Sequence, residues 1–468
     1  MQSLPNELLA QIASHLESQP SSITKFNHEP TAHLAYSQTE LNNNPLKSLS
    51  LVSWRLRKIV LPILFRYVRI PLDKEPQWVP TDARLVDSMQ SELSTLSNHE
   101  FMLYTKLRGK FKSSAGGAFE PAMDDVLIQL CRIQDGDEFL KRTDRKVWLP
   151  HLSSWFPNFK KFAEGNELKH HIRSVVVCTD EEFKLRYVVT ALETLAREVS
   201  RMWNQIFELS EPERFVVAAP PKTMAALLES GVATNDSWAF EMKMHYIEFV
   251  QTLPSAITSN TEIEKNSRQP SDIGLIHRRP WSHIGYNEGS SITAYSIYEF
   301  QFMTTPRILE ILLDRLAKNS KSCANLSSFS LIAVFPLSSH ITQIVSAMHR
   351  IPSIRKITLQ LAPGPENDLL SNGSKRRKAQ SSDFWSEWRL GYKALADMDQ
   401  LRRVYSGEDG TGWEPALEEI VSRDCYTKQL GEEVKEVVEH YLKQAKLRWK
   451  SDGVGRWVRD ESEVEDVD

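Results

Sequence analysis

Short runs of strand-forming residues alternate with amphipathic helix patterns through residues 151–406, and this alternation constrains the fold most. The strand candidates are rich in β-branched or large apolar residues and are bounded by proline, serine or glycine. They are residues 172–178, 215–219, 329–335, 357–362 and 401–405. Apolar residues recur at three- and four-residue steps in 181–207, and another helix pattern begins at Pro306. Strands that alternate with helices favour parallel pairing through crossover helices, so we predict a mixed α/β fold.

One spacing recurs near several of these strands: an apolar residue is followed by others three and six positions later. The four copies are Phe156–Phe162, Leu326–Ile332, Ile351–Ile357 and Met398–Val404. The middle two begin 25 residues apart (351 − 326), within the roughly 20–29-residue period of leucine-rich repeats. A unit of this size buries its apolar side only against stacked neighbours. We therefore predict an irregular, interrupted solenoid, although any α/β protein produces some such steps.

Composition excludes several classes of protein. The chain has 468 residues, with 57 Lys plus Arg against 61 Asp plus Glu, a net charge of −4. A general nucleic-acid-binding domain would be basic, so we expect no nucleic-acid partner. The sequence opens without the charged and apolar regions of a signal peptide, and no stretch approaches about 18 consecutive apolar residues. We expect no membrane partner and a location in the cytoplasm, the nucleus or both.

Four widely spaced cysteines favour reduced thiols, because a disulfide framework needs a denser set. They are Cys131, Cys178, Cys323 and Cys425. We find no phosphate-binding glycine loop, no nucleophile elbow and no histidines at metal-ligand spacing. The sequence therefore predicts no catalytic residue, no metal and no cofactor, although a site assembled from distant residues in 151–406 stays an alternative.

The N-terminal segment carries more apolar surface than so short a piece can bury. Residues 8–16 place leucine and isoleucine on one helix face, and Pro5 suits the first turn. A second apolar run covers 46–59, Pro62 is expected to break it, and 67–70 reads as a strand. Without its polar middle this segment has about 40 residues, a size at which a lone core is rarely sufficient. An uncovered apolar patch indicates a protein-docking module.

These residues resemble an F-box of the fungal type. The resemblance rests on Leu-Pro-x-Glu-Leu-Leu-x-x-Ile-x-x-x-Leu at 4–16, Leu-x-x-Leu-Ser-Leu-Val-Ser at 46–53 and Leu-Pro-Ile-Leu-Phe-Arg at 61–66. It implies binding to a Skp-type adaptor, and through it to a cullin, in a cullin–RING ubiquitin ligase. Leucine-rich repeats often follow the box in this family. Residues 17–45 are longer than the family's usual link and polar, so we expect a looped-out insert.

The resemblance implies an adaptor-binding site of seven residues. They are Leu4, Pro5, Leu8, Leu9, Ile12, Leu49 and Val52. A Leu-Pro pair at a helix start and a leucine/isoleucine stripe suit a helical groove as anchors at i, i+3 and i+4. The alternative for each residue is the small core of the module itself, which we expect to take roughly half of them.

We therefore divide the chain into four parts. They are an F-box-like module at 1–70 with its insert at 17–45, a helical linker region at 71–150, the irregular repeat region at 151–406, and C-terminal helices with an acidic tail at 407–468. Residues 258–287 and 363–383 read as loops, the second with a basic island at 375–378 that is a solvated tip or a nuclear-import signal. The predicted function is a non-catalytic receptor that presents an unidentified protein substrate to the ligase. The alternatives are a scaffold outside any ligase and an enzyme.

Overall fold

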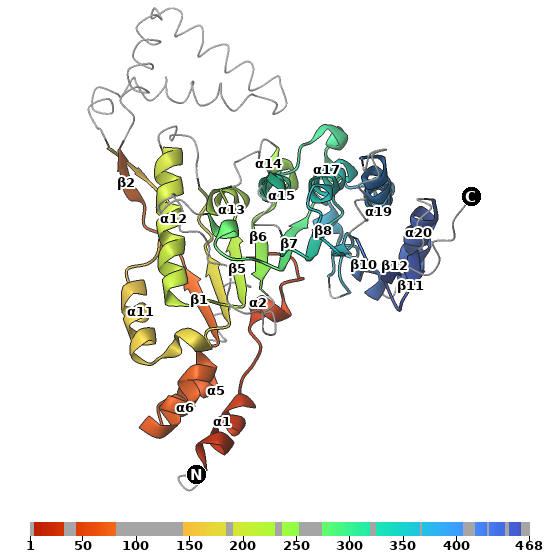
Figure 1. The fold of residues 1–468 in the computed structure, drawn as a ribbon. Coiled ribbons are helices and arrows are strands. Elements are labelled where there is room, and N and C mark those ends of the chain that lie inside the picture. Colours follow the sequence, from red (N-terminus) through yellow and green to blue (C-terminus); the bar gives the residue numbers. More distant parts are fainter. Residues whose placement is uncertain are drawn as a thin grey trace, which may run out of the picture. The chain divides into compact units, whose positions relative to one another are not determined.

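The computed structural model of the chain is drawn in Figure 1. It describes residues 4–31, 44–80, 144–183, 191–229, 236–251, 274–318, 324–365, 367–405, 417–427, 430–444 and 449–459. The chain divides into two units, one made of residues 1–73, 151–182 and 199–468 and the other of residues 74–150 and 183–198.

Within the described residues of the first unit, ten strands form one sheet. Their spatial order is β1 (Tyr67–Pro71), β4 (Ser174–Cys178), β5 (Arg214–Ala219), β6 (His245–Val250), β7 (His283–Ser290), β8 (Ser328–Val334), β9 (Lys356–Gln360), β10 (Glu419–Ser422), β12 (Arg456–Arg459) and β11 (Trp449–Ser451). As far as β10 this order follows the sequence. The pairs β1–β4–β5 and β7–β8–β9–β10 are parallel, and β6 is antiparallel to both of its neighbours. The result confirms a mixed α/β fold.

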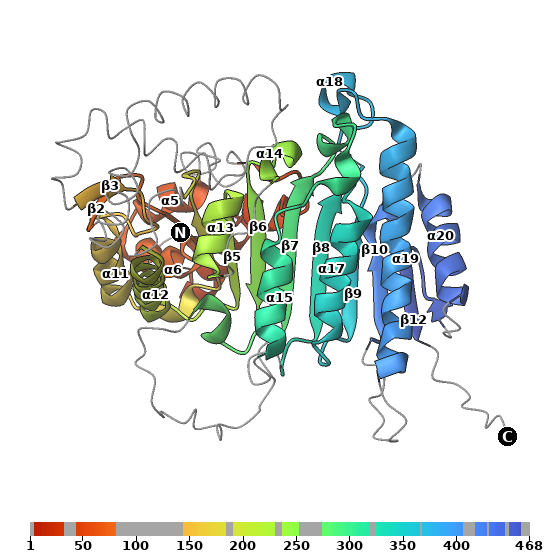
Figure 2. The ribbon, with the colours of Figure 1, turned by 90° about the horizontal axis from the view of Figure 1, so that it is seen from above.

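Helices cover one face of this sheet (Figure 2). The helices on that face include α13 (Pro221–Leu227), α15 (Ile308–Lys318), α17 (Ser338–His349), α19 (Ser381–Tyr405) and α20 (Gly431–Gln444). Apolar strand residues such as Val217, Phe249 and Leu331 are buried between the sheet and the helices. The apolar side chains that the strands direct to this face explain why helices cover it.

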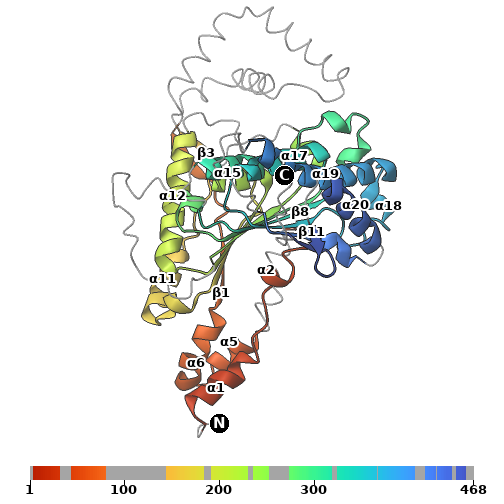
Figure 3. The ribbon, with the colours of Figure 1, turned by 45° about the vertical axis from the view of Figure 1, so that its right-hand side comes forward.

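Eight further α-helices are described. They are α1 (Asn6–Ser14), α2 (Ser21–Thr24), α5 (Pro45–Ser50), α6 (Trp54–Leu64), α11 (Phe156–Gly165), α12 (Ala191–Leu209), α14 (Ser237–Phe240) and α18 (Gly373–Arg376). Figure 3 places α2 on the opposite side of the sheet from α15 and α17. We call the face on which α2 lies the strap face.

In the second unit, β2 (Gln77–Pro80) pairs antiparallel with β3 (Asp144–Val147). Most of the predicted helical linker, residues 81–143, lies outside the described residues. Residues 406–416 and residues 460–468, which include the acidic tail, also lie outside them. None of the described helices combines the length and the apolar character needed to cross a membrane.

Strands β1, β4, β5, β8 and β9 confirm five sequence predictions within one or two residues at each end. The strand predicted at 401–405 is wrong, because these residues continue α19, and a short apolar run does not distinguish a strand from the end of a helix. The break predicted at Pro62 is also wrong: Pro62 lies inside α6, which ends two residues later. Residues 283–287, predicted as loop, belong to β7.

The predicted repeats match the fold in part. The copies at 326–332 and 351–357 lead into β8 and β9, which are parallel neighbours joined through α17. The copy at 156–162 lies in α11 and the copy at 398–404 lies in α19, so neither leads into a strand as predicted. The sheet also begins with β1 and continues beyond β10, so it crosses the boundaries predicted at residues 70 and 406. The C-terminal end contains α20 together with β10, β11 and β12 rather than helices alone.

Candidate functional site

The N-terminal helices α1, α5 and α6 pack around a small apolar cluster. Its buried members are Ala13, Leu46, Val60 and Ile63, with Leu49 and Leu64 partly buried against them. Side-chain caps begin two of these helices: Asn44 accepts from the amide of Leu46 at 2.9 Å, and Ser53 accepts from the amide of Leu56 at 3.2 Å. Arg55 donates to Asn6 at 2.8 Å, which brings the start of α6 beside the start of α1.

The seven predicted adaptor residues divide between this core and the surface. Leu8, Ile12 and Val52 are exposed by 45%, 48% and 70%, and Pro5 is exposed as well. Leu9 is only 4% exposed and belongs to the core, while Leu4 and Leu49 are half-buried. The apolar face of α1 is therefore wider than its contact with α6. The leucine and isoleucine at positions 8 and 12 remain available to another molecule.

Three exposed apolar residues escaped the sequence prediction. Leu16, Leu51 and Trp54 are exposed by 40%, 73% and 79%. Leu51 and Val52 lie at the turn between α5 and α6, and Trp54 is the first residue of α6, directly after the capping residue Ser53. The sequence feature that could have indicated these exposed residues is the run of three large apolar residues around the capping serine. We refer to these exposed residues of the N-terminal helices as the apolar patch: Leu8, Ile12, Leu16, Leu51, Val52 and Trp54.

The strap face carries a second candidate surface. The strand register places Val176, Val216, Glu248, Gly285 and Ser330 in one row across β4–β8, and Cys178, Ala218, Tyr246, Asn287 and Ile332 in the next. Residues 20–31, which we call the strap, lie against these rows. The prediction of a looped-out insert is therefore wrong for the strap, while residues 32–43 lie outside the described part.

The strap is held mainly through its own backbone. Arg214 donates to the carbonyl oxygen of Ser22 at 2.8 Å. Asn287 donates to the carbonyl oxygens of Phe26 and His28, at 2.6 and 2.9 Å. Tyr246 bonds both main-chain groups of Thr31, donating to the oxygen at 2.7 Å and accepting from the nitrogen at 3.0 Å. Burial by the strap raises the pKa of Tyr246 to about 12, because the phenolate would lose its hydration.

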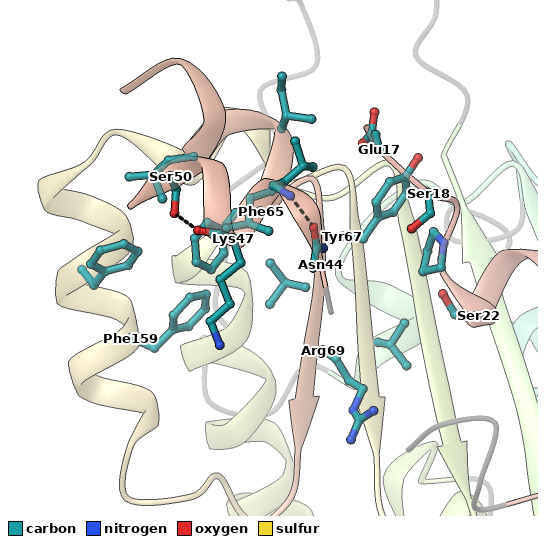
Figure 4. Close-up of a pocket in the computed structure, with 18 of the residues that line it drawn as sticks. Glu17, Ser18, Ser22, Asn44, Lys47, Ser50, Phe65, Tyr67, Arg69 and Phe159 are labelled. Atoms are coloured by element: carbon teal, nitrogen blue, oxygen red, sulfur yellow. Dashed lines mark hydrogen bonds between the residues drawn. The ribbon is translucent and has the colours of Figure 1, made fainter. Parts of the chain in front are cut away.

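A cavity of about 610 Å³ lies where the strap, the N-terminal helices and the edge of the sheet meet (Figure 4). Its walls include Leu46, Leu61, Phe65, Phe159 and Phe162, and its polar lining includes Glu17, Lys47, Arg57 and Arg69. The ring of Phe65 lies 5.8 Å from that of Phe159 and 5.6 Å from that of Phe162, so the end of α6 is packed on α11. The volume falls in the range of small-molecule sites.

A buried polar network lies between the sheet and α17. The hydroxyl of Thr305 is 2.7 Å from Nδ1 of His340, whose Nε2 is 3.0 Å from a carboxylate oxygen of Glu288. This order of hydroxyl, imidazole and carboxylate is also that of a nucleophilic triad. However, none of the three side chains is more than 4% exposed, so this geometry gives a substrate no access to the hydroxyl.

His245 lies beside the same network on β6. Its Nδ1 is 2.6 Å from the hydroxyl of Tyr286, and it is fully buried. Burial lowers the pKa of His245 to about 4, against the opposing effect of the Glu288 carboxylate. Within the described residues, no group of three or more histidine, cysteine, aspartate or glutamate side chains could hold a metal ion.

Comparison with known proteins adds no relative. No protein-family model, curated protein or solved structure matches the chain.

Proposed function

We propose that this chain is an F-box-like substrate receptor of a cullin–RING ubiquitin ligase. The N-terminal helices bind a Skp-type adaptor, and the α/β region binds the target protein. The apolar patch carries this proposal, because three of its members are exposed by 70% or more. Large apolar residues gathered on a soluble module indicate a protein interface.

The chemistry of the patch suits a helical partner. Leu8 and Ile12 lie one helical turn apart on α1, and Leu16 follows four residues later in the turn after the helix, so the three residues supply apolar anchors. Trp54 adds the type of large, rigid side chain that contributes most to protein interfaces. Arg55 links the start of α6 to the start of α1, so both parts of the patch belong to one docking surface.

The sheet supports the second half of the proposal. Sequential strand order with helices on one face is the arrangement of a leucine-rich-repeat solenoid, whose other face binds partners. The antiparallel strand β6 departs from a regular solenoid, in keeping with an irregular one. Such a receptor performs no bond chemistry. It raises the effective concentration of a target lysine near the conjugating enzyme, in the cytoplasm or nucleus.

A pull-down with the full chain tests this function. Leu8→Asp combined with Ile12→Asp should abolish recovery of a Skp-type adaptor and a cullin, since both residues are exposed and both would carry charge into an apolar groove. Gln11→Asp is the matched control, because it adds charge to an exposed position between them on α1. Recovery of the adaptor without cullin would indicate a scaffold. Equal recovery by wild type and the double variant, or no adaptor with either, would contradict the proposal.

A further inference from the structure

The strap is bound in the manner of a peptide ligand. Five hydrogen bonds from three sheet side chains reach its backbone, at Ser22, Phe26, His28 and Thr31. Backbone recognition of this kind does not depend on which side chains the bound segment carries. Any segment that follows the same path, with a helical turn and further turns over residues 21–28, could make the same five bonds.

Two strap side chains add selectivity. Phe26 is 5% exposed and packs in an apolar depression formed by Val176, Val216, Ala218 and Tyr246. The guanidinium of Arg214 lies 5.7 Å from the centre of the Phe26 ring, within the range of a cation–π contact. The depression therefore suits an aromatic side chain.

A second subsite receives a carboxylate. Glu29 accepts a hydrogen bond from the amide of Ser290 at 3.1 Å, next to Gly289. A Cβ atom at Gly289 would lie only 2.8 Å from the Glu29 carboxylate, so glycine leaves the room that this group occupies. The two subsites are spaced for an aromatic residue followed three positions later by an acid.

The strap has few structural features of its own that would prevent another segment from replacing it. Its one helix, α2, has four residues and no side-chain cap. From Thr24 to Thr31 only Phe26 and Pro30 are buried, and the other side chains are exposed. A competing segment would therefore have to replace few buried groups.

We propose that the strap face is a binding site for a protein segment that adopts the helical-turn path of the strap and carries an aromatic residue and, three positions later, a carboxylate, and that the strap occupies this site in cis. The inference deepens the target-binding half of the proposed function and does not depend on the adaptor half. A target would enter by displacing the strap, so the receptor is closed until a segment of this chemistry competes successfully.

A fluorescence-polarisation experiment with the full chain tests this inference. The probe is a labelled peptide of residues 20–31. Phe26→Ala with Glu29→Ala in the chain releases the strap and leaves every sheet residue in place. We expect the released chain to bind the peptide at least tenfold more tightly than wild type, whose tethered strap competes at an effective concentration on the order of millimolar. Lys25→Ala with His28→Ala, at two exposed strap positions, is the matched control and should behave as wild type.

Two further binding measurements test whether the peptide occupies the strap face. A peptide with alanine at both subsite positions should bind the released chain at least tenfold more weakly, and Tyr246→Phe in that chain should weaken the unmodified peptide. If the double substitution impairs folding, Glu29→Lys alone supplies a second released chain, since Glu29 is exposed. Folded released chains that do not bind the peptide, or that bind it no better than wild type, would overturn the inference. No adaptor is present, so this failure would leave the docking of the N-terminal helices untouched.

Discussion

The carboxamide of Asn287 donates a hydrogen bond of 2.6 Å to the backbone oxygen of Phe26, which precedes it by 261 residues. The same amide nitrogen donates to His28, and the amide oxygen accepts from Gly289 at 3.0 Å. The amide nitrogen and the amide oxygen of this buried side chain are therefore both hydrogen-bonded. One residue of β7 thus couples the conformation of the strap to that of the sheet.

Gly289→Ala should loosen the strap. The new methyl group would meet Glu29 at 2.8 Å and the Pro30 ring at 3.1 Å, and the backbone φ of +80° adds strain for any residue other than glycine. We expect faster amide exchange at Thr31 and a loss of about 1–3 kcal/mol in unfolding free energy. Gly453→Ala is the control: its φ is +100°, but nothing lies within 4 Å, so it carries the strain without the collision. Equal exchange at Thr31 in both variants would contradict the prediction.

Leu9 and Ile12 should separate core from interface on one helix. Leu9→Ala removes a residue that is 4% exposed and should cost about 2–5 kcal/mol of unfolding free energy. Ile12→Ala removes a residue that is 48% exposed and should change stability by less than about 0.5 kcal/mol while weakening adaptor binding. Chemical unfolding and adaptor titration check the two effects. A large stability loss for Ile12→Ala would mean that the residue is not available for docking.

His245 should make the protein less stable in mild acid. Its pKa is about 4 in the fold and 6.5 when unfolded, so the unfolded chain binds more protons between these values. The contribution of neutral His245 to the unfolding free energy is complete above pH 6.5. It is lost as pH falls toward 4, by roughly 3 kcal/mol in total. The unfolding free energy, measured in guanidinium from pH 4 to 7.5, should depend less on pH for His245→Asn than for His15→Asn. The second variant changes an exposed imidazole. Equal slopes would be inconsistent with a buried neutral His245.

Asp424 should act with the opposite sign. Burial raises its pKa from 3.8 to about 6, although donors from Leu361, Ala362, Trp388 and Tyr392 favour the charged form. The contribution of the protonated Asp424 carboxyl to the unfolding free energy is complete below pH 3.8. It is lost as pH rises through 6, again by roughly 3 kcal/mol. Asp424→Asn should therefore destabilise the protein more at pH 4 than at pH 7.

The overlap of these two effects determines how they must be measured. Both titrations fall between about pH 4 and pH 6.5, and their slopes have opposite signs. The wild-type profile alone would therefore understate each of them. The two single variants, compared at each pH, separate them, and a loss for Asp424→Asn that does not vary with pH would contradict the assignment.

The sequence was sufficient to predict elements whose residues share one local environment. Strands β4 and β8 are continuous apolar runs because both of their faces are buried, and their positions were predicted within a residue or two. The burial of adjacent residues of the same type is harder to predict from the sequence. Leu8 and Leu9 differ by about 100° around α1, and only the tertiary packing of the helix decides that Leu9 is the buried one.

The strap was beyond local prediction for a physical reason. Its side chains are mostly exposed and polar, which is also the composition of a solvated loop. What fixes it is a set of donors on Arg214, Tyr246 and Asn287, which lie about 190 to 260 residues away and bind backbone atoms that every sequence possesses. Gly285 and Asn287 also made the start of β7 read as loop. Gly285 is there because a Cβ atom would lie 2.7 Å from Glu248.

Only residues 15–19 separate the end of α1 from the strap, and Glu17 among them forms an ion pair with Arg66 just beyond α6. Two ligands that use neighbouring parts of one short covalent segment obey thermodynamic linkage. If occupancy of the strap face alters the adaptor's affinity by some factor, the adaptor must alter occupancy of that face by the same factor. Under the proposed function, the joint between helix and strap would couple binding of a target to binding of the adaptor.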